Sequence, residues 1–329
     1  MIKFSQKRME EIFYHAAPKK ILVLGDVMVD EYLWGNVSRL SPEAPVPIVS
    51  IENEQLRFGG AANVAYNIMG LNATPIIVGI VGNDRMGQIF REMMLEKNLP
   101  TDGIVAVDDR PTTTKTRIIG DNQHIARVDK ESTAPISGEI QDRLFKICLD
   151  YLDEVDAIII EDYNKGVVVP ALIEKLVDTA NRQGKIVTVD PKFENFLSFK
   201  NVTVFKPNTK ETEEALAMRI RSEDDLLVAG EKLLKELNSE SVLITRGPKG
   251  MALFQRDEVP YLVETFARKV ADVSGAGDTV IATLTMALAG GASLKEAVSL
   301  ANYAAGIVCE EVGAVPIELE KLSKIVLAL

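Results

Sequence analysis

Cysteine, histidine and tryptophan are scarce in this chain of 329 residues, which holds two, two and one of them respectively. Cys148 and Cys309 lie in helical apolar patterns without CxxC or metal-ligand spacing. We therefore expect two buried core thiols, and neither a disulfide framework nor a zinc site. The two histidines, His15 and His124, form no motif, and His124 is interpreted as a pairing or packing residue of a strand.

Long hydrophobic runs are also missing. The longest apolar stretch, at positions 279–289, is too short to span a bilayer and directly follows the charged Asp278. The amino-terminal segment carries charges throughout and contains neither an apolar core nor a small-residue cleavage site. These absences predict a cytoplasmic protein with no membrane segment.

Positive charge is in deficit, because the formal net charge is -11 and the pI is about 4.9. No stripe of lysine or arginine interrupts the acidic background, so nucleic acid is excluded as an expected partner. An acidic enzyme still binds phosphorylated ligands through local devices, such as helix amino termini, Mg²⁺ and a few placed basic residues. Any phosphate-binding site in this chain is therefore expected at such local features.

Short apolar runs alternate with amphipathic segments along the chain. The apolar runs favour buried strands, at 21–24, 76–81, 157–160, 186–189, 202–205 and 242–245. The amphipathic segments have helical periodicity, at 85–98, 138–155, 170–183 and 223–237. Strand then helix, repeated, predicts an α/β fold whose mostly parallel sheet is covered on both faces. Because no linker or repeat divides the chain, we expect one domain over 1–329.

Two regions break this alternation, at about 34–57 and 112–129. Threonine-rich and alternating apolar residues there favour antiparallel strands over helices. We expect these strands to form a small lid over one edge of the sheet. No GxGxxG motif follows the first strand, where Gly25 and Asp26 stand, so a dinucleotide-dependent oxidoreductase is disfavoured.

The strongest single motif is the Gly275-Ala276-Gly277-Asp278 turn, which leads into a long apolar helix. Glycines at a helix amino terminus let backbone N–H groups converge, and the helix dipole adds positive charge, so the turn suits a transferring phosphoryl group. Asp278, in the first helical turn, can then face a substrate hydroxyl. The alternative is a glycine-rich turn with an aspartate cap.

Two further segments follow expected strands at the carboxyl edge, where open α/β sheets bind ligands. Asn208 and Glu211, three apart, share one face of a first helical turn and could order Mg²⁺-bound water. An ordinary capping pair is the alternative. Thr245, Gly247 and Lys249 fit a nucleotide-binding turn, although a hairpin turn explains the glycines equally well.

Carboxylate and amide groups near the amino terminus suit sugar hydroxyls, because a polyol supplies the donors that a buried carboxylate needs. Asp30 follows the first strand and can accept two hydroxyls. Gly59 and Gly60 precede a helix that carries Asn63, and they allow a sugar to approach the backbone. A tight strand-to-helix turn is the alternative for the two glycines.

In this order the motifs resemble the ribokinase-like, or PfkB, family of carbohydrate kinases over essentially the whole chain. The signatures are 59–63 with 79–87 downstream, and 272–279. The resemblance implies a three-layer fold with a β-lid that often forms homodimers. It also implies Asp278 as the base, and Gly275, Ala276 and Gly277 as an anion hole. The ATP and Mg²⁺ site that it implies comprises Asn208, Glu211, Thr245, Gly247, Lys249 and Asn302, with Glu211 acting on the metal through water.

Within the family, segments 39–49, 113–117, 161–166 and 190–192 resemble kinases that phosphorylate D-glycero-β-D-manno-heptose 7-phosphate at C1. This likeness adds Asp190 and Lys192 to the substrate site of Asp30, Gly59, Gly60 and Asn63. Many such kinases are fused to a nucleotidyltransferase with an HxGH motif, which is missing here, so we expect a separate adenylyltransferase. The alternatives are a kinase for another sugar and a non-catalytic binding protein.

A phosphorylated substrate also needs positive charge for its distal phosphate. Arg39, Lys165 and Lys192 are the candidates offered by the resembling segments, although each taken alone is better explained as a solvated surface residue.

Overall fold

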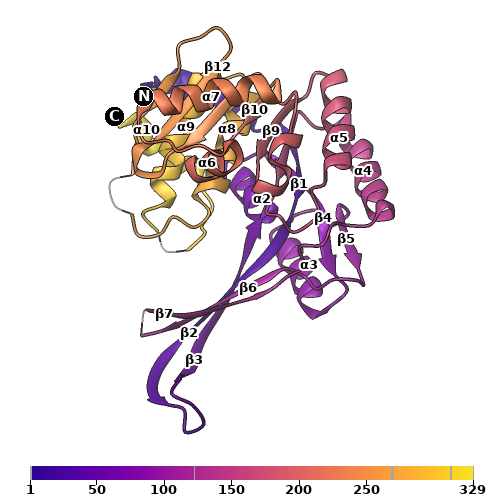
Figure 1. The fold of residues 1–329 in the computed structure, drawn as a ribbon, viewed down its shortest axis with the longest axis vertical. Coiled ribbons are helices and arrows are strands. Elements are labelled where there is room, and N and C mark those ends of the chain that lie inside the picture. Colours follow the sequence, from indigo (N-terminus) through magenta and orange to yellow (C-terminus); the bar gives the residue numbers. More distant parts are fainter. Residues whose placement is uncertain (1, 122, 268–269, 312, 329) are drawn as a thin grey trace.

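The protein is described by a computed structural model that covers residues 2–121, 123–267, 270–311 and 313–328. A nine-stranded sheet forms its centre, with helices on both faces, and a second sheet of four strands extends away from this body (Figure 1). The predicted three-layer α/β fold with a mostly parallel sheet and a β-strand lid is confirmed.

Seven strands of the central sheet run parallel, and β12 and β13, which are joined by antiparallel pairing, close one edge. The strand runs are apolar without alternation because both faces are covered. The order across the sheet is β13-β12-β11-β10-β9-β8-β1-β4-β5. The bounds are β1 Lys20–Gly25, β4 Thr74–Gly82, β5 Ile104–Val107, β8 Ala157–Glu161, β9 Ile186–Asp190, β10 Val204–Phe205, β11 Ser241–Thr245, β12 Met251–Gln255 and β13 Tyr261–Val263.

Two separate hydrophobic clusters lie on the two faces of this sheet. Helices α1, α2, α3, α8, α9 and α10 contribute to one cluster, and α4, α5, α6 and α7 to the other. The bounds are α1 Gln6–Ala16, α2 Ala61–Gly70, α3 Arg85–Glu96, α4 Gly138–Leu152, α5 Pro170–Arg182, α6 Thr209–Leu216, α7 Glu223–Leu237, α8 Ala276–Ala289, α9 Leu294–Val308 and α10 Leu319–Leu327. Helix α1 joins the far end of the chain through an ion pair of 2.7 Å between Arg8 and Glu296. Cys148 and Cys309 are buried free thiols, as expected.

The second sheet, which we call the arm, has the order β3-β2-β6-β7. Its strands are β2 Val27–Leu40, β3 Pro47–Gly60, β6 Thr114–Gly120 and β7 Gln123–Lys130. Antiparallel pairing was expected, but β2 and β6 pair in parallel, so the arm is a mixed sheet. The reason is that the chain returns through α2, β4, α3 and β5 before it enters β6, which brings it back in the direction of β2.

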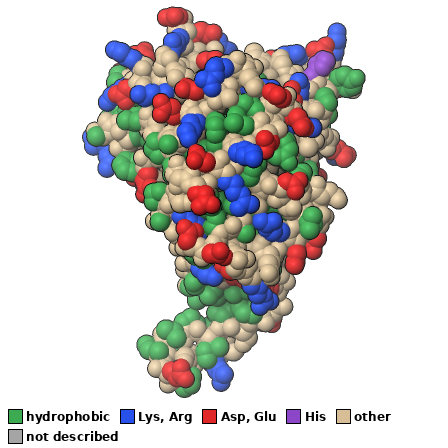
Figure 2. Space-filling view, turned by 90° about the vertical axis from the view of Figure 1, so that its right-hand side faces the viewer, with side chains coloured by type: hydrophobic (Ala, Val, Ile, Leu, Met, Phe, Trp, Pro, Cys, Tyr) green, Lys and Arg blue, Asp and Glu red, His purple; other side chains and the backbone are tan. Residues whose placement is uncertain are grey.

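The arm carries exposed apolar side chains. Leu40, Val46 and Val128 are 64%, 51% and 55% exposed. Figure 2 shows hydrophobic side chains gathered toward the lower end of the molecule, where the arm ends. Among the described residues, no helix combines the length and apolar character needed to cross a bilayer.

Candidate active site

Charged side chains gather at the carboxyl edge of the central sheet. Glu161 and Asp190 end the neighbouring strands β8 and β9 and face each other in register. Lys206 follows β10, the next strand. Asp278 reaches the same edge from the first turn of α8. All four side chains are buried, so the carboxyl edge of the sheet holds a buried cluster of charged groups.

The Asp278 carboxylate is held by two donors from distant parts of the chain. Asn63 Nδ2 donates to Oδ2 at 2.7 Å, and the Tyr163 hydroxyl donates to Oδ1 at 2.8 Å. Burial raises the pKa of Asp278 to about 6, while these two hydrogen bonds act in the opposite direction. A carboxylate with a pKa near 6 is ionised at neutral pH and accepts a proton more readily than an exposed aspartate.

The glycine turn before Asp278 forms the amino terminus of α8. Gly275 caps α8 with φ of +77°, a left-handed geometry that suits glycine. A Cβ on Gly275 would lie 2.9 Å from Asn63 Nδ2, so a larger residue at this position would collide with Asn63. Gly277 lies near Asp190 and the Lys206 ammonium, which a Cβ would approach to 3.5 and 3.7 Å. The helix amino terminus thus opens beside a buried cation, which suits an anion.

Three carboxylates, from Glu161, Asp190 and Asp278, approach within 4.8 Å of one another. Lys206 Nζ contacts Asp190 Oδ2 at 2.7 Å. Both carboxylate oxygens of Glu161 are buried without a hydrogen-bond partner, and burial raises its pKa well above the usual range. Hard oxygen donors with an unsatisfied carboxylate are chemically suited to a cation such as Mg²⁺.

Asn208 and Glu211 form a capping box at the start of α6. Asn208 Oδ1 accepts from the Glu211 amide at 2.9 Å, and Glu211 Oε2 accepts from the Asn208 amide at 2.8 Å. Glu211 Oε1 also contacts the Lys192 ammonium at 2.7 Å. The pair therefore caps α6. It follows β10, which is the neighbour of β9, the strand that ends in Asp190 of the carboxylate cluster.

A cavity of about 640 Å³ opens beside this cap. Asn208, Thr245, Gly247 and Lys249, four of the residues assigned to ATP, are in its wall. Asn302 is not among the lining residues of that cavity; it is buried in α9, and its Nδ2 donates to the Glu264 carbonyl at 2.8 Å.

The sugar-side residues of the sequence analysis lie where the arm joins the body. Asp30 in β2 is buried and pairs with Arg117 of β6. A Cβ on Gly59 would come within 2.6 Å of Asp30 Oδ2, and a Cβ on Gly60, with φ of +57°, within 2.2 Å of the Asp26 carbonyl. The two glycines thus allow β2 and β3 to come close where α2 begins, which puts Asn63 beside Asp278.

Sequence reasoning gave no role to Tyr163, Glu161 or Lys206, which complete the cluster. A usable signal was present, because each stands at or just after the end of an apolar run. The role of Asp26 was also not predicted; its carboxylate accepts hydrogen bonds from the backbone amides of Tyr163, Lys165 and Val167 at 2.7, 3.0 and 3.2 Å. That buried carboxylate shapes the loop that presents the Tyr163 hydroxyl.

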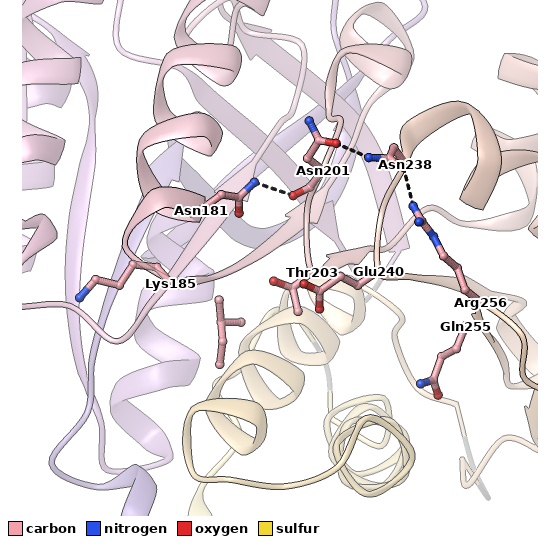
Figure 3. Close-up of a pocket in the computed structure, with 10 residues that line it drawn as sticks. Asn181, Lys185, Asn201, Thr203, Asn238, Glu240, Gln255 and Arg256 are labelled. Atoms are coloured by element: carbon pink, nitrogen blue, oxygen red, sulfur yellow. Dashed lines mark hydrogen bonds between the residues drawn. The ribbon is translucent and has the colours of Figure 1, made fainter.

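A second large cavity, of about 690 Å³, lies at the opposite edge of the sheet, at the amino ends of β9, β10 and β11 (Figure 3). Asn201 links two of its walls by accepting from Asn181 at 2.9 Å and from Asn238 at 2.6 Å. The carboxylate cluster is at the other edge, so this cavity plays no part in the site.

The fold and the buried cluster define a carbohydrate-kinase type of phosphotransferase. The chain belongs to the pfkB family of carbohydrate kinases, whose family model matches residues 18–321. It is 40% identical over 308 residues to the bifunctional protein HldE of Geobacter sulfurreducens, and 41% identical over 303 residues to that of Desulfatibacillum aliphaticivorans. These alignments cover 94% and 92% of the chain but only 63% and 62% of the relatives' own lengths.

Solved structures share the fold at lower identity. The Arabidopsis thaliana ribokinase complexed with ribose and ATP superposes with a TM-score of 0.74 at 20% identity, covering 94% of this chain and 99% of the other. Phosphofructokinase-2 from Escherichia coli in complex with potassium gives 0.77 at 19% identity, with coverage of 94% and 98%.

Proposed function

We propose that this kinase transfers the γ-phosphoryl group of ATP to the C1 hydroxyl of D-glycero-β-D-manno-heptose 7-phosphate. The observation that carries the kinase chemistry is the buried Asp278, held by Asn63 and Tyr163 directly behind the Gly275 turn. The choice of sugar is supported by about 40% identity to HldE proteins over nearly the whole chain, together with the likeness of the arm segments.

In the proposed reaction, the C1 oxygen attacks the γ-phosphorus in line. The new C1 O–P bond forms as the bond to the β–γ bridging oxygen breaks, and ADP leaves with that electron pair. Asp278 accepts the hydroxyl proton, late in a loose transition state. Tyr163 and Asn63 orient its carboxylate, so that its free lone pairs face the sugar. Most of the rate enhancement comes from positioning and charge stabilisation.

The nucleotide would occupy the cavity beside Asn208, with its phosphates reaching toward the amino terminus of α8. Backbone N–H groups at Gly275, Ala276 and Gly277, with the helix dipole, would hold the transferring group. Glu161, with Glu211 through water, would hold Mg²⁺, which neutralises phosphate charge when bound.

The sugar would lie between the arm and the body. Asp30, Asn63 and Asp190 would receive its hydroxyl groups, and Gly59 and Gly60 would let it approach the backbone. Arm residues Thr113 and Thr114 stand at the entrance to β6 and would help exclude water when the arm closes, since water competes for the phosphoryl group.

The test is ATP consumption with Mg²⁺ and four acceptors at matched concentration: the heptose 7-phosphate, ribose, fructose and fructose 6-phosphate. Preferential turnover of the heptose phosphate supports the proposal. Preferential turnover of another sugar retains the kinase mechanism and rejects the substrate. If none of the four acceptors causes ATP consumption, a non-catalytic binding protein is favoured instead.

A further inference from the structure

One buried residue, Asp26, joins three segments of the chain at the carboxyl end of β1. Its amide donates to the Glu161 carbonyl at 3.1 Å, where β8 ends. Its carbonyl accepts from the Ala61 amide at 3.0 Å, where α2 begins. Its carboxylate accepts three amides of the loop at 163–167, which follows β8. Because Asp26 is only 1% exposed, all of these contacts lie inside the protein.

The loop after β8 has a backbone conformation that suits this carboxylate. Its three amide donors, at alternate positions from 163 to 167, are separated by Asn164 with φ of +54° and Gly166 with φ of +79°. Such an arrangement is typical of a backbone nest, in which N–H groups converge on one anion. A Cβ on Gly166 would lie 2.0 Å from the Ala134 carbonyl oxygen, so this turn has no room for a larger residue. The loop conformation and the Asp26 carboxylate therefore depend on each other.

Tyr163 connects two buried aspartates. Its backbone amide donates to Asp26 Oδ2 at 2.7 Å, and its hydroxyl donates to Asp278 Oδ1 at 2.8 Å. The Lys192 ammonium lies 5.1 Å from the centre of the Tyr163 ring, which is thus also covered on one face. Because the hydroxyl and the amide belong to the same residue, a shift of the loop backbone would carry the hydroxyl away from Asp278.

The second donor to Asp278 is placed by the backbone of Asp26. Ala61, which donates to the Asp26 carbonyl, is the first residue of α2, and Asn63 follows in the same helical turn. Gly60 is the N-cap of α2 and offers no side chain to cap the helix. A Cβ on Gly60 would lie 2.2 Å from the Asp26 carbonyl oxygen, so the close approach requires glycine. The Asp26 carbonyl therefore fixes the first turn of the helix from which Asn63 reaches Asp278.

We propose that Asp26 is a positioning residue for phosphoryl transfer, which holds the loop at 162–167 and the first turn of α2 where Tyr163 and Asn63 both donate to Asp278. Asp26 acts through these two donors, whereas Asp278 takes the proton itself. This proposal rests on the base role of Asp278 in the proposed function. It extends that function by making the placement of the base depend on one residue at the end of β1.

The experiment compares two aspartates that join β1 to β8 at opposite edges of the sheet. Asp26→Asn keeps the size of the side chain but turns an NH₂ group, a donor, toward the amides of the loop. The control is Asp156→Asn. Asp156 Oδ2 accepts the Lys20 amide at 3.0 Å, and the Asp156 amide donates to the Lys20 carbonyl at 2.8 Å, where β1 begins.

Each variant is assayed for kcat and KM with ATP, Mg²⁺ and the acceptor that the wild type consumes fastest among the four named above. The stoichiometry of ATP binding gives the concentration of folded sites, and kcat is expressed per site. We expect Asp26→Asn to lower kcat by about 10- to 100-fold, since a misplacement of about 1 Å in an active site costs up to that much.

KM for ATP should stay within about twofold in Asp26→Asn, because an effect on the placement of the base lowers kcat alone. Asp156→Asn should match the wild type in both parameters. Asp26→Ser, which keeps one short acceptor, should show the same pattern as Asp26→Asn. It takes the place of that variant if Asp26→Asn yields too little folded protein.

A double-mutant cycle with Tyr163→Phe separates positioning from a general loss of structure. Tyr163→Phe removes the hydroxyl but keeps the backbone amide that donates to Asp26. If Asp26 acts through that hydroxyl, adding Asp26→Asn to Tyr163→Phe should lower kcat by no more than about threefold further. Two independent losses of structure would instead multiply.

Multiplied effects in the cycle would overturn the positioning role, as would an equal fall of kcat in Asp156→Asn. If Asp278→Asn is slow but Asp26→Asn keeps kcat within about threefold of the wild type, the positioning role fails and the proposed function stands. If Asp278→Asn keeps the wild-type kcat, the base role fails and the positioning role fails with it. A wild type that consumes ATP with none of the acceptors would reject both.

Discussion

Asp278 combines two properties that usually oppose each other, because it is buried and yet ionised near neutral pH. Burial favours the neutral acid, whereas the hydrogen bonds from Asn63 and Tyr163 favour the carboxylate. The balance leaves the pKa at about 6, close to the value that suits a general base at physiological pH. The two donors thus set how strong the base is as well as where it points.

Removing the base should leave a folded protein that transfers phosphoryl groups slowly. We expect Asp278→Asn to lower kcat by roughly 10²- to 10⁴-fold, the usual contribution of one acid or base group. The Kd for ATP should change little, because the nucleotide cavity is lined by other residues. Steady-state kinetics and a nucleotide titration check this prediction. A kcat within a few-fold of the wild type would remove Asp278 from the base role.

The pH dependence of kcat/KM follows from the raised pKa of Asp278. A base with a pKa of about 6 is protonated below that pH, so kcat/KM should fall as the pH drops through 6. The Tyr163 hydrogen bond lowers the pKa, so Tyr163→Phe should move the acid limb of the profile to higher pH. A profile from pH 5 to 9 measures both effects. An unmoved limb in Tyr163→Phe, with kcat merely reduced, would contradict this coupling.

At the scale of elements, two helices with the same kind of capping box allow the stabilising role of a cap to be separated from a role in nucleotide binding. α6 begins with Asn208 and Glu211, and α9 begins with the equivalent pair Ser293 and Glu296. Only the first borders the nucleotide cavity.

We expect Asn208→Ala and Ser293→Ala to destabilise the fold comparably, by about 1 kcal/mol, since each removes one cap. Only Asn208→Ala should raise KM for ATP. Chemical denaturation and ATP-dependent kinetics distinguish the two effects. Equal KM values in the two variants would reduce Asn208 to a helix cap.

The sequence was informative about elements and less so about contacts between them. Apolar runs and turn residues predicted six strands of the body but not β5, β12 or β13. Gly275 and Asp278 were found because a glycine turn before a helix is a local signal. Tyr163 and Lys206 were missed because their roles depend on which strands are neighbours. The parallel pairing of β2 with β6 has the same cause, since no local pattern encodes the path of the chain between them.

At the scale of the whole molecule, the exposed apolar residues of the arm lead us to expect self-association. Its exposed apolar residues, among them Leu40, Val46 and Val128, are ones that a second copy could cover. We expect a homodimer through the arm, with a mass by light scattering twice the 36.1 kDa of one chain.

Val128→Glu should shift that mass toward the monomer. Val259→Glu, at a residue that is 86% exposed and lies outside the arm, should leave it unchanged. A monomer in the wild type at assay concentration would contradict the prediction, and so would identical masses in the two variants.

The distance along the chain between Asn63 and Asp278 has a consequence for synthesis in the cell. These hydrogen-bonded partners are separated by 215 positions. At typical translation rates, the ribosome needs roughly 10 to 40 seconds to pass from one to the other. Until α8 emerges, the surfaces of α1 and α2 that contact it stay uncovered, and the nascent chain must be kept from aggregating. A trigger-factor-type chaperone that holds apolar segments during that interval should therefore raise the soluble yield of this enzyme.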